Sequence, residues 1–266
     1  MLRKKRGSVE WLEFEIFQEF PNLKHAVFTR HGGVSEGPFA SLNAGGGTGD
    51  DENKIDLNRA KIRKLLGCKT LVSGKQVHGI QVRLAPLEPG NEECDGLITQ
   101  TPGAGLLIKH ADCQAVLFYD PLEKGLGLIH AGWRGNVQNI YGEALAHMRA
   151  AFGSKPENIF VGVSPSLGPC CGQFIHYEKE IPRPFWSFQI RPQYFDLWEM
   201  ARSQLLQAGI LPHHLEIAPI CTFCTPADFY SYRRDKPTGR NATVACLQST
   251  RSPSGIKAHC GHNSCI

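Results

Sequence analysis

Two short apolar runs near the middle of the chain, residues 115–119 and 126–129, are separated by a polar turn segment with proline and glycine. Runs of this length with such boundaries are typical of strands, so they predict a β-hairpin. A third run, residues 105–108, precedes the hairpin and predicts another strand. We therefore expect residues 105–135 to be the part around which the rest of the chain is organised.

Apolar positions at helical spacing predict three helices. Residues 51–67 begin with two acids and end in Gly67, which are favourable start and stop signals for an amphipathic helix. Residues 136–152 show the same spacing and are followed by Gly153, so one helix is expected there as well. A further helix is predicted near residues 197–208.

Shorter apolar runs predict the remaining strands, at residues 9–17, 71–73, 80–84, 94–99, 159–163, 216–219 and 243–247. Residues 25–50 hold a short strand and then a long glycine-dense loop, and loops of that length are usually functional or disordered. Because strands and helices alternate irregularly, without a repeat or linker, we expect a mixed-sheet α/β (α+β) domain. Residues 252–266 are rich in Cys and His and are expected to form a flexible tail.

Composition narrows the classes of partner. The 266 residues are 41% hydrophobic, which is typical of an ordinary globular protein, and no apolar run approaches the length of a membrane span. The net charge of +4 is spread along the chain, so no nucleic-acid partner is indicated. The basic start, residues 1–6, is followed by a segment broken by acids and resembles no signal peptide, which favours a cytoplasmic protein.

The ten cysteines also bear on the compartment. An even number is compatible with disulfides in a secreted chain, but Cys170 and Cys171 are adjacent and awkward for two independent bridges. A chain of this length does not need disulfides for its stability. We therefore expect free thiols in a reducing compartment.

Three residues stand out as candidates for chemistry: His78, Cys113 and His130. Each follows or ends an apolar run beside glycine or alanine. Two imidazoles and a thiolate suit zinc with an open fourth position, and the same trio suits a Cys–His nucleophile pair. A buried cysteine is also often only an apolar filler, and histidines are often structural. Spacing by itself leaves these alternatives open.

A series of short motifs runs in order along most of the chain. They are residues 28–35 (FTRHGGVS), 41–43 (SLN), 49–51 (GDD), 58–59 (NR), 75–79 (KQVHG), 95–99 (DGLIT), 111–113 (ADC), 130–135 (HAGWRG), 168–171 (GPCC) and 231–235 (SYRRD). In these motifs the chain resembles the YfiH/laccase-domain family. That family was first named for multicopper polyphenol oxidases and is now regarded as one of purine nucleoside phosphorylases.

The resemblance implies a single-domain α-β-β-α sandwich over residues 1–266, with a catalytic zinc held by His78, Cys113 and His130. It implies phosphorolysis of inosine and adenosine, cleavage of methylthioadenosine and deamination of adenosine. Purine nucleosides and phosphate are therefore the expected partners. Phosphorolysis needs cations near the phosphate, and Arg30, Arg59 and the glycine-dense loop with Asn43 are our candidates for binding it.

Two other functions are considered. A copper-dependent polyphenol oxidase needs a trinuclear copper cluster with His-X-His pairs, and none of the eleven histidines forms such a pair. A single copper on the trio is chemically possible but cannot reduce dioxygen by four electrons, so zinc is favoured over copper. The other alternative is a zinc-binding module that is not an enzyme.

Further residues near these motifs carry weaker predictions. Cys221 and Cys224 form a CxxC pair, and with Cys260 and Cys265 of the tail they are candidates for a second, structural zinc site. Reduced thiols without metal are the simpler interpretation of these four. Asp112 is expected to orient a ligand or take a proton beside Cys113.

Overall fold

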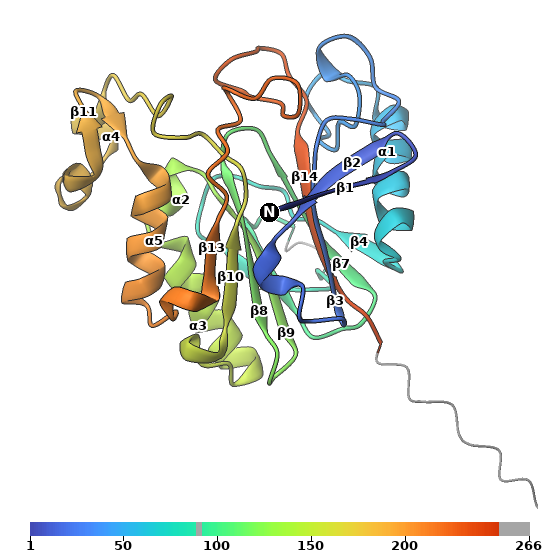
Figure 1. The fold of residues 1–266 in the computed structure, drawn as a ribbon, viewed down its shortest axis with the longest axis horizontal. Helices are drawn as coiled ribbons and strands as arrows, with labels where there is room; N and C mark the ends of the chain where they lie inside the picture. The colour runs from blue at the N-terminus through green and yellow to red at the C-terminus, as the bar shows by residue number, and fades with distance from the viewer. Residues whose placement is uncertain (89–91, 250–266) are drawn as a thin grey trace, which may run out of the picture.

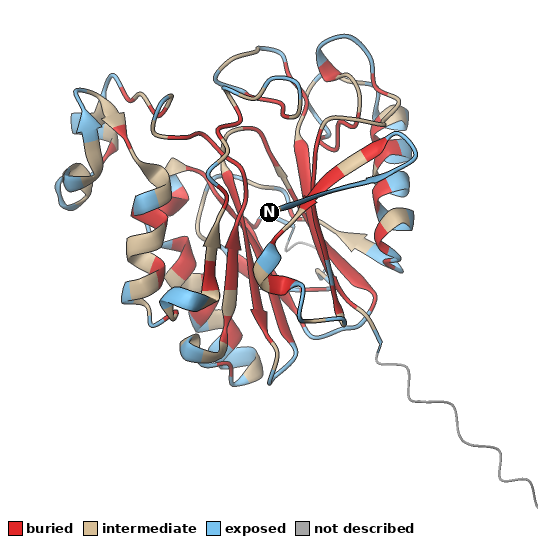
Figure 2. Cartoon of the chain, viewed as in Figure 1, coloured by how far each residue is buried: buried red, intermediate tan, exposed pale blue. Residues whose placement is uncertain are grey.

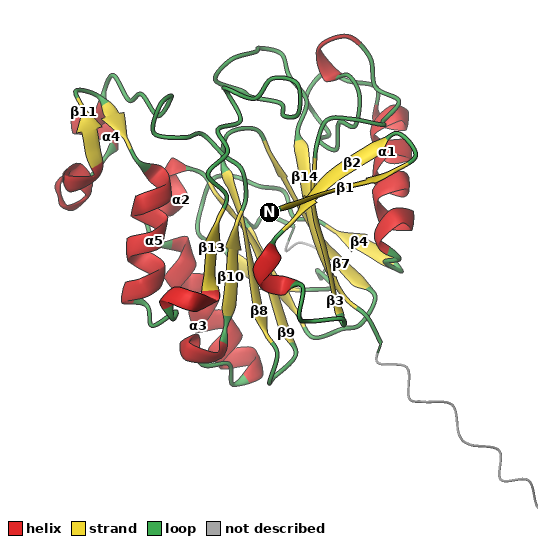
Figure 3. Ribbon diagram, viewed as in Figure 1, coloured by secondary structure: helices red, strands yellow, loops and turns green. Residues whose placement is uncertain are grey.

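The computed structural model describes residues 1–88 and 92–249. Two six-stranded sheets pack face to face, and helices cover the outer face of each sheet (Figure 1). The loops that leave the upper ends of the strands gather on one side of the molecule (Figure 3). The expected mixed-sheet α-β-β-α architecture in a single domain is thus confirmed.

Each sheet mixes parallel and antiparallel neighbours. The first sheet has the order β1 (Leu2–Arg6), β2 (Val9–Glu13), β3 (Leu23–Phe28), β14 (Asn241–Leu247), β7 (Ala104–His110) and β4 (Thr70–Val72). The second has the order β13 (Leu215–Ile217), β10 (Phe160–Val163), β8 (Gln114–Asp120), β9 (Gly125–Ala131), β6 (Gly96–Thr99) and β5 (Val82–Leu84). A small hairpin, β11 (Gln189–Arg191) and β12 (Tyr194–Phe195), stands apart from both.

The α-helices are α1 (Glu52–Leu66), α2 (Trp133–Val137), α3 (Ile140–Phe152), α4 (Tyr177–Glu180) and α5 (Leu197–Gln207). Short 3₁₀ helices occur at η1 (Glu15–Phe17), η2 (Gly37–Phe39), η3 (Pro156–Asn158), η4 (Arg183–Phe188) and η5 (Pro212–His214). Helix α1 packs on the first sheet, whereas α3 and α5 pack on the second. None of the helices in residues 1–88 and 92–249 is long and apolar enough to cross a membrane.

Helix α1 matches its sequence signals closely. The Asp51 side chain accepts a hydrogen bond from the Asn53 backbone N–H at 2.9 Å, which satisfies one of the free donors at the helix start. Gly67 closes the helix with φ of 69°, a left-handed conformation that glycine adopts at little cost. The buried residues Ile62 and Leu66 lie on the face toward the first sheet.

The predicted central hairpin is present as the antiparallel pair β8 and β9. Gln114 lies opposite Ala131 at one end, and Asp120 lies opposite Gly125 at the other. Every residue of both strands is buried, because one face packs on the first sheet and the other on α3 (Figure 2). Along β8, Leu117 points into the core between the sheets, and its neighbour Phe118 points toward the helices. Burial on both faces explains why this segment is an unbroken apolar run instead of an alternating one.

Three details differ from the sequence-based expectations. The helix predicted over residues 136–152 begins only at Ile140, because Asn139 adopts a left-handed φ of 61° and its side chain accepts a hydrogen bond from the Gly142 backbone N–H. Residues 133–137 form the separate helix α2. The strand predicted over residues 9–17 ends at Glu13 and continues as η1. Strand β1 was not predicted: all its side chains are exposed, so the sequence carries no alternating pattern there. The predicted tail, residues 252–266, lies outside the described residues.

Candidate functional site

The structure brings His78, Cys113 and His130 together at one end of the second sheet. His78 lies in the segment between β4 and β5, Cys113 in the turn between β7 and β8, and His130 near the end of β9. Their ligand atoms all lie within 4.8 Å of one another. The two imidazole rings meet edge to face, with centroids 4.9 Å apart. The trio singled out from the sequence is therefore a cluster in space.

The backbone around this cluster is held in an uncommon conformation. His78 has φ of 60° and Asp112, directly before Cys113, has φ of 84°, and both values are unusual for residues other than glycine. Such residues persist where surrounding contacts over-determine them, and they concentrate at functional sites. The contacts at His78 come from a carboxylate, and those at Asp112 come from two loops described below.

The carboxylate of Asp95 organises the cluster. Its two oxygens accept hydrogen bonds from the backbone N–H groups of Val77, His78 and Gly79, at 3.1, 3.0 and 2.7 Å. The Oδ1 atom also lies 2.8 Å from His130 Nδ1. Because Nδ1 is taken by Asp95, the Nε2 atom of His130 is left free to bind a metal, the arrangement that orients many metal-binding histidines.

Asp95 is fully buried and was missed as a functional residue. Burial alone raises the pKa of its carboxyl, but the hydrogen bonds from His130 and the backbone outweigh this, and the net pKa is lowered. One signal was present in the sequence: a carboxylate directly before the apolar strand residues 96–98, in a position where a buried charge needs partners.

Cys113 and His130 influence each other's protonation. Burial by itself raises the pKa of Cys113, yet the positive charge and hydrogen bond of His130, together with His78, lower it to about 6. For His130 burial lowers the pKa, and the charge of Cys113 and the bond to Asp95 raise it above its ordinary value. The cluster therefore favours a thiolate, which is the form of cysteine that binds metals or attacks substrates.

The donor set fits a zinc ion. A thiolate and two imidazoles from three separate segments match a site with three protein ligands and an open fourth position. Gly132 leaves the space beside them: a Cβ atom there would lie 2.9 Å from His78 Cδ2 and 3.3 Å from Cys113 Sγ. A side chain at position 132 would push against two of the three ligands, so glycine is required here.

The cluster lies at a cleft of about 570 Å³. The described residues that line it are Gly45, Gly46, Lys75, Gln76, His78, Lys109, His110, Ala111, Cys113, His130, Arg134, Tyr232 and Arg240. None of these lining residues is acidic, whereas four carry Lys or Arg side chains. A cleft with this charge favours an anionic ligand.

Lys109 is one of these cations and is held in place by its neighbours. Its Nζ donates to the Gly74 carbonyl oxygen at 2.9 Å, and its backbone exchanges two hydrogen bonds with the Gln76 side chain at 2.7 and 3.0 Å. Burial, and then the positive charge of Arg59, lower the pKa of Lys109 to about 8. A desolvated, fixed ammonium group interacts more strongly with an anion than a mobile surface lysine does.

Asn43 and Arg59, predicted to bind substrate, do not line this cleft. The Asn43 side chain is buried and accepts hydrogen bonds from the backbone N–H groups of Gly45 and Arg240, at 2.9 and 2.8 Å. Arg59 Nε donates to the Ala44 carbonyl oxygen at 3.0 Å. Both residues hold the loop whose glycines line the cleft, and direct contact with substrate stays a prediction.

Two other candidates have their polar atoms engaged elsewhere. Arg30 Nε donates to the Ala40 carbonyl oxygen at 2.8 Å, and its guanidinium lies 4.6 Å from the ring centre of Tyr230. The Asp112 carboxylate accepts from Thr222 Oγ1 at 2.7 Å and from the Arg233 backbone N–H at 2.6 Å. Asp95 orients His130 in this structure, and the role that we expected of Asp112 beside Cys113 stays a prediction.

Comparison with known proteins bears on the family. The model of the family described as "Multi-copper polyphenol oxidoreductase laccase" matches residues 24–248, which include the whole trio. This chain belongs to the laccase-domain family.

Relatives of this laccase-domain chain carry the name of a nucleoside enzyme. This chain is 35% identical over 240 residues to "Purine nucleoside phosphorylase YlmD" of Geobacillus stearothermophilus, and the match covers 82% of this chain and 88% of the relative. It is 36% identical over 248 residues to a "Purine nucleoside phosphorylase" of Deinococcus radiodurans, covering 88% and 94%. The crystal structure of Bacillus licheniformis hypothetical protein YfiH superposes with a TM-score of 0.82 at 28% identity, covering 92% and 99%.

Proposed function

We propose that this chain is a zinc-dependent purine nucleoside phosphorylase that acts on inosine, adenosine and methylthioadenosine and also deaminates adenosine. The observation that carries the proposal is the His78–Cys113–His130 cluster at a cleft lined by cations and free of acids among its described residues. The names of the relatives support the phosphorylase part of this proposal.

In this proposal His78, Cys113 and His130 hold the zinc, and Asp95 fixes the tautomer and orientation of His130. Zinc in such a site acts as a Lewis acid that polarises an oxygen of the substrate or of water. Every other contribution comes from the protein itself. The cluster lies beside the cations, so a nucleoside near the ligands and a phosphate near the cations fit the cleft together.

The cations bind and orient phosphate. Lys109 and Arg240 both line the cleft, and charge-assisted hydrogen bonds from such groups to phosphate are the strong kind. A phosphate oxygen then forms a bond to C1′ of the ribose as the bond from C1′ to N9 breaks. The electron pair of that bond stays on the purine, which takes up a proton as it leaves.

Tyr232 provides a surface for the purine. Its ring is half-exposed at the cleft, and the Lys236 ammonium lies 4.5 Å from the ring centre. An exposed aromatic face is a good platform for stacking a base and discriminates little between purines. This agrees with the proposed range of inosine, adenosine and methylthioadenosine.

Cys113 acts as a ligand in this proposal and not as a nucleophile. A thiolate committed to a metal is a poor attacker, and the Asp95–His130 pair is the arrangement expected around a metal. Phosphate and nucleoside are then bound at the same time, so phosphorolysis should follow sequential kinetics. A covalent adduct trapped on Cys113, or ping-pong kinetics, would show that Cys113 is the nucleophile.

The two alternatives find less support. Among the described residues, the groups of His, Cys, Asp and Glu that could hold a metal are this trio and a set of four cysteines, which do not suit a trinuclear copper cluster. A binding module without catalysis does not require a cationic cleft beside the metal ligands. We also infer a reducing compartment, the cytoplasm, because all eight cysteines of the described residues are free.

Product analysis tests the proposal. With inosine and phosphate the purified protein should release hypoxanthine and ribose 1-phosphate, and with adenosine some inosine should form even without phosphate. Cys113→Ala should lose the zinc of this site and both activities together, whereas Cys68→Ala, a buried cysteine elsewhere, should keep them. If neither product exceeds the level of the Cys113→Ala variant, the nucleoside assignment is wrong.

A further inference from the structure

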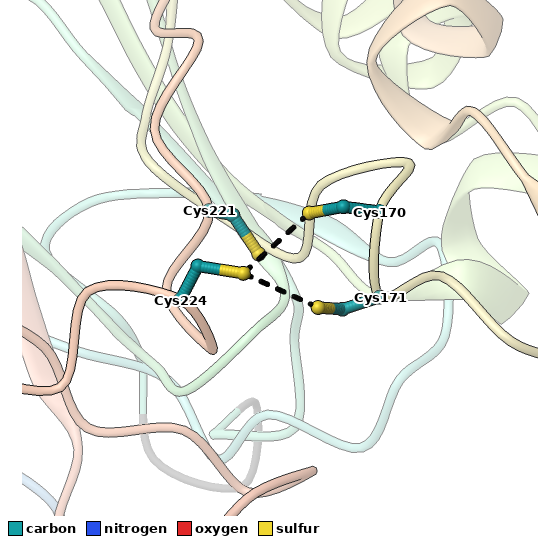
Figure 4. A group of neighbouring side chains, drawn as sticks. All are labelled: Cys170, Cys171, Cys221 and Cys224. Atoms are coloured by element: carbon teal, nitrogen blue, oxygen red, sulfur yellow. Dashed lines mark hydrogen bonds between the residues drawn. The ribbon is translucent and has the colours of Figure 1, made fainter.

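A second cluster of metal-binding side chains lies outside the cleft. It consists of Cys170, Cys171, Cys221 and Cys224, which come from two loops far apart in the sequence. Cys170 and Cys171 follow β10, and Cys221 and Cys224 follow β13, the parallel neighbour of β10. Figure 4 shows the four side chains turned toward a common point.

The distances are those of a ligand shell and not of disulfides. The sulfur atom of Cys224 lies 3.6 Å from that of Cys170 and 3.4 Å from that of Cys171, and all four sulfurs lie within 4.8 Å of one another. A disulfide bond is about 2.05 Å long. Tetrahedral zinc with bonds of about 2.3 Å to sulfur spaces its ligands about 3.8 Å apart.

The two loops are joined in a way that fixes these positions. The Thr222 backbone N–H donates to the Ser166 carbonyl oxygen at 3.0 Å, and the Ser166 N–H donates to the Ile220 carbonyl oxygen at 3.2 Å. The Gly168 backbone N–H donates to Cys221 Sγ at 3.3 Å. A backbone N–H aimed at a sulfur stabilises a thiolate, the form that binds metal.

The four sulfurs affect one another's protonation. Burial, followed by its contacts with Cys221 and Cys224, raises the pKa of Cys170 to about 11. Burial and the neighbouring sulfurs also raise the pKa of Cys171. In Cys221 the backbone N–H groups of Gly168 and Cys224 outweigh burial and lower the pKa. A divalent cation at the centre would remove the repulsion between the thiolates.

We propose that Cys170, Cys171, Cys221 and Cys224 bind a second, structural zinc ion. Four thiolates form a closed shell with no open position, which is typical of structural zinc sites. The described partners of the CxxC pair are thus the adjacent cysteines 170 and 171. The sequence-based candidates Cys260 and Cys265 lie outside the described residues.

The position of this site relates it to the first one. Thr222, within the CxxC segment, donates to the Asp112 carboxylate, and the Leu167 backbone N–H donates to the Asp112 carbonyl oxygen at 2.8 Å. Asp112 directly precedes Cys113 and has the unusual φ of 84°. Zinc bound by the four cysteines ties together the two loops that hold this residue in place. The four cysteines do not line the cleft, and they affect it only through the loops that hold Asp112.

Elemental analysis of the intact protein, purified without chelator, tests the assignment. The wild-type chain should hold two zinc ions, Cys224→Ser one, Cys113→Ala one, and the double variant none. Cys68→Ala and the double variant Cys260→Ser with Cys265→Ser serve as controls and should both keep two. A wild-type chain with one zinc that is lost completely in Cys113→Ala would overturn the proposal, as would two zinc ions retained in Cys224→Ser.

Two further measurements do not depend on the stability of the Cys224 variant. Cobalt added to the metal-free Cys113→Ala protein should give the intense thiolate-to-cobalt absorption and tetrahedral d–d bands of a four-sulfur site. The four thiols of the wild-type protein should resist alkylation until a chelator is added. Alkylation without a chelator, or a disulfide found among the four under non-reducing conditions, would refute a zinc site. None of these readouts uses enzymatic activity, so they stand apart from the test of the proposed function.

Discussion

Replacing Asp95 by asparagine changes one buried atom and tests how the proposed metal site of His78, Cys113 and His130 is organised. In the native structure Oδ1 accepts from the His78 backbone N–H and faces His130 Nδ1, while Oδ2 accepts from the N–H groups of Val77 and Gly79. An asparagine has one oxygen and one NH₂ group. If the NH₂ group replaces Oδ2, it faces the N–H groups of Val77 and Gly79, and two buried bonds are lost. If it replaces Oδ1, the bond from the His78 N–H is lost, and the contact with His130 survives only when Nδ1 becomes the acceptor.

The expected magnitude follows from the one or two donors that lose their acceptor. Each such buried donor costs about 1–3 kcal/mol, so Asp95→Asn should lower the free energy of unfolding by about 1–6 kcal/mol. Loss of a carboxylate behind a metal-binding histidine typically lowers metal affinity by about 10–100-fold. If the NH₂ group faces His130, the ring must shift its proton to Nε2, and the lone pair that binds metal is then lost.

The assay is a zinc competition titration against a chelator, combined with urea unfolding of the metal-free protein. Cys224→Ser should serve as the background for both measurements, so that only the first site is counted. Asp120→Asn is a matched control: Asp120 is also buried on the second sheet, but its Oδ2 has no hydrogen-bond partner in the described structure. Its Oδ1 holds the turn after β8 and is retained in asparagine. Wild-type zinc affinity in Asp95→Asn would refute the assigned role of the carboxylate.

Three further predictions address other parts of the molecule. Burial lowers the pKa of His25 to about 4, so the folded state binds its proton less readily than the unfolded state, whose pKa is about 6.5. The contribution of neutral His25 to the free energy of unfolding should therefore be complete above pH 6.5, and about 3 kcal/mol should be lost as the pH falls toward 4. In His25→Gln the free energy of unfolding measured with urea should vary less with pH in that window. Leu117→Ala, between the two sheets, should lower the free energy of unfolding by about 2–5 kcal/mol, whereas the exposed Leu122→Ala should change it by less than about 0.5 kcal/mol; equal effects would contradict the core assignment. Lys109→Met should raise the KM for phosphate by about 10–100-fold at saturating inosine, since a charged hydrogen bond contributes about 1.5–3 kcal/mol. Lys75→Met should have a smaller effect, because Lys75 is already paired with Glu93 at 2.7 Å. A larger effect of Lys75→Met would place the phosphate near Lys75 instead.

The sequence was most informative where one physical rule determined the outcome. Helix α1 followed from its acidic start and from Gly67, and the central hairpin from two apolar runs around a turn. The start of α3 was placed too early because the apolar period runs through Asn139, whose left-handed backbone separates α3 from α2. Strand β1 was missed because a fully exposed edge strand leaves no pattern of burial.

The candidate site was predicted in part for a related reason. The residue types suggested a set of metal ligands, and their positions at the ends of apolar runs suggested that they meet. Arg30 and Arg59 were predicted as the phosphate-binding cations, and Lys109 and Arg240 of the cleft were not. Lys109 and Arg240 lie far apart in sequence, and only the packing of β7 beside β14 brings these segments together. Asp95 was missed because a carboxylate before an apolar strand indicates only that the charge needs partners, and the four hydrogen bonds that make it important come from other segments.

The route of the chain gives the trio a mechanical meaning. His78 lies where the chain crosses from the first sheet to the second between β4 and β5, and Cys113 lies where it crosses again between β7 and β8. A metal ion held by these residues and by His130, as proposed, would link the two sheets. A shift of one sheet relative to the other would move the ligands apart. The affinity for the metal ion should therefore depend on how the two sheets pack against each other. Substitutions in the core between the sheets, even far from every ligand, should therefore lower the affinity for the metal ion.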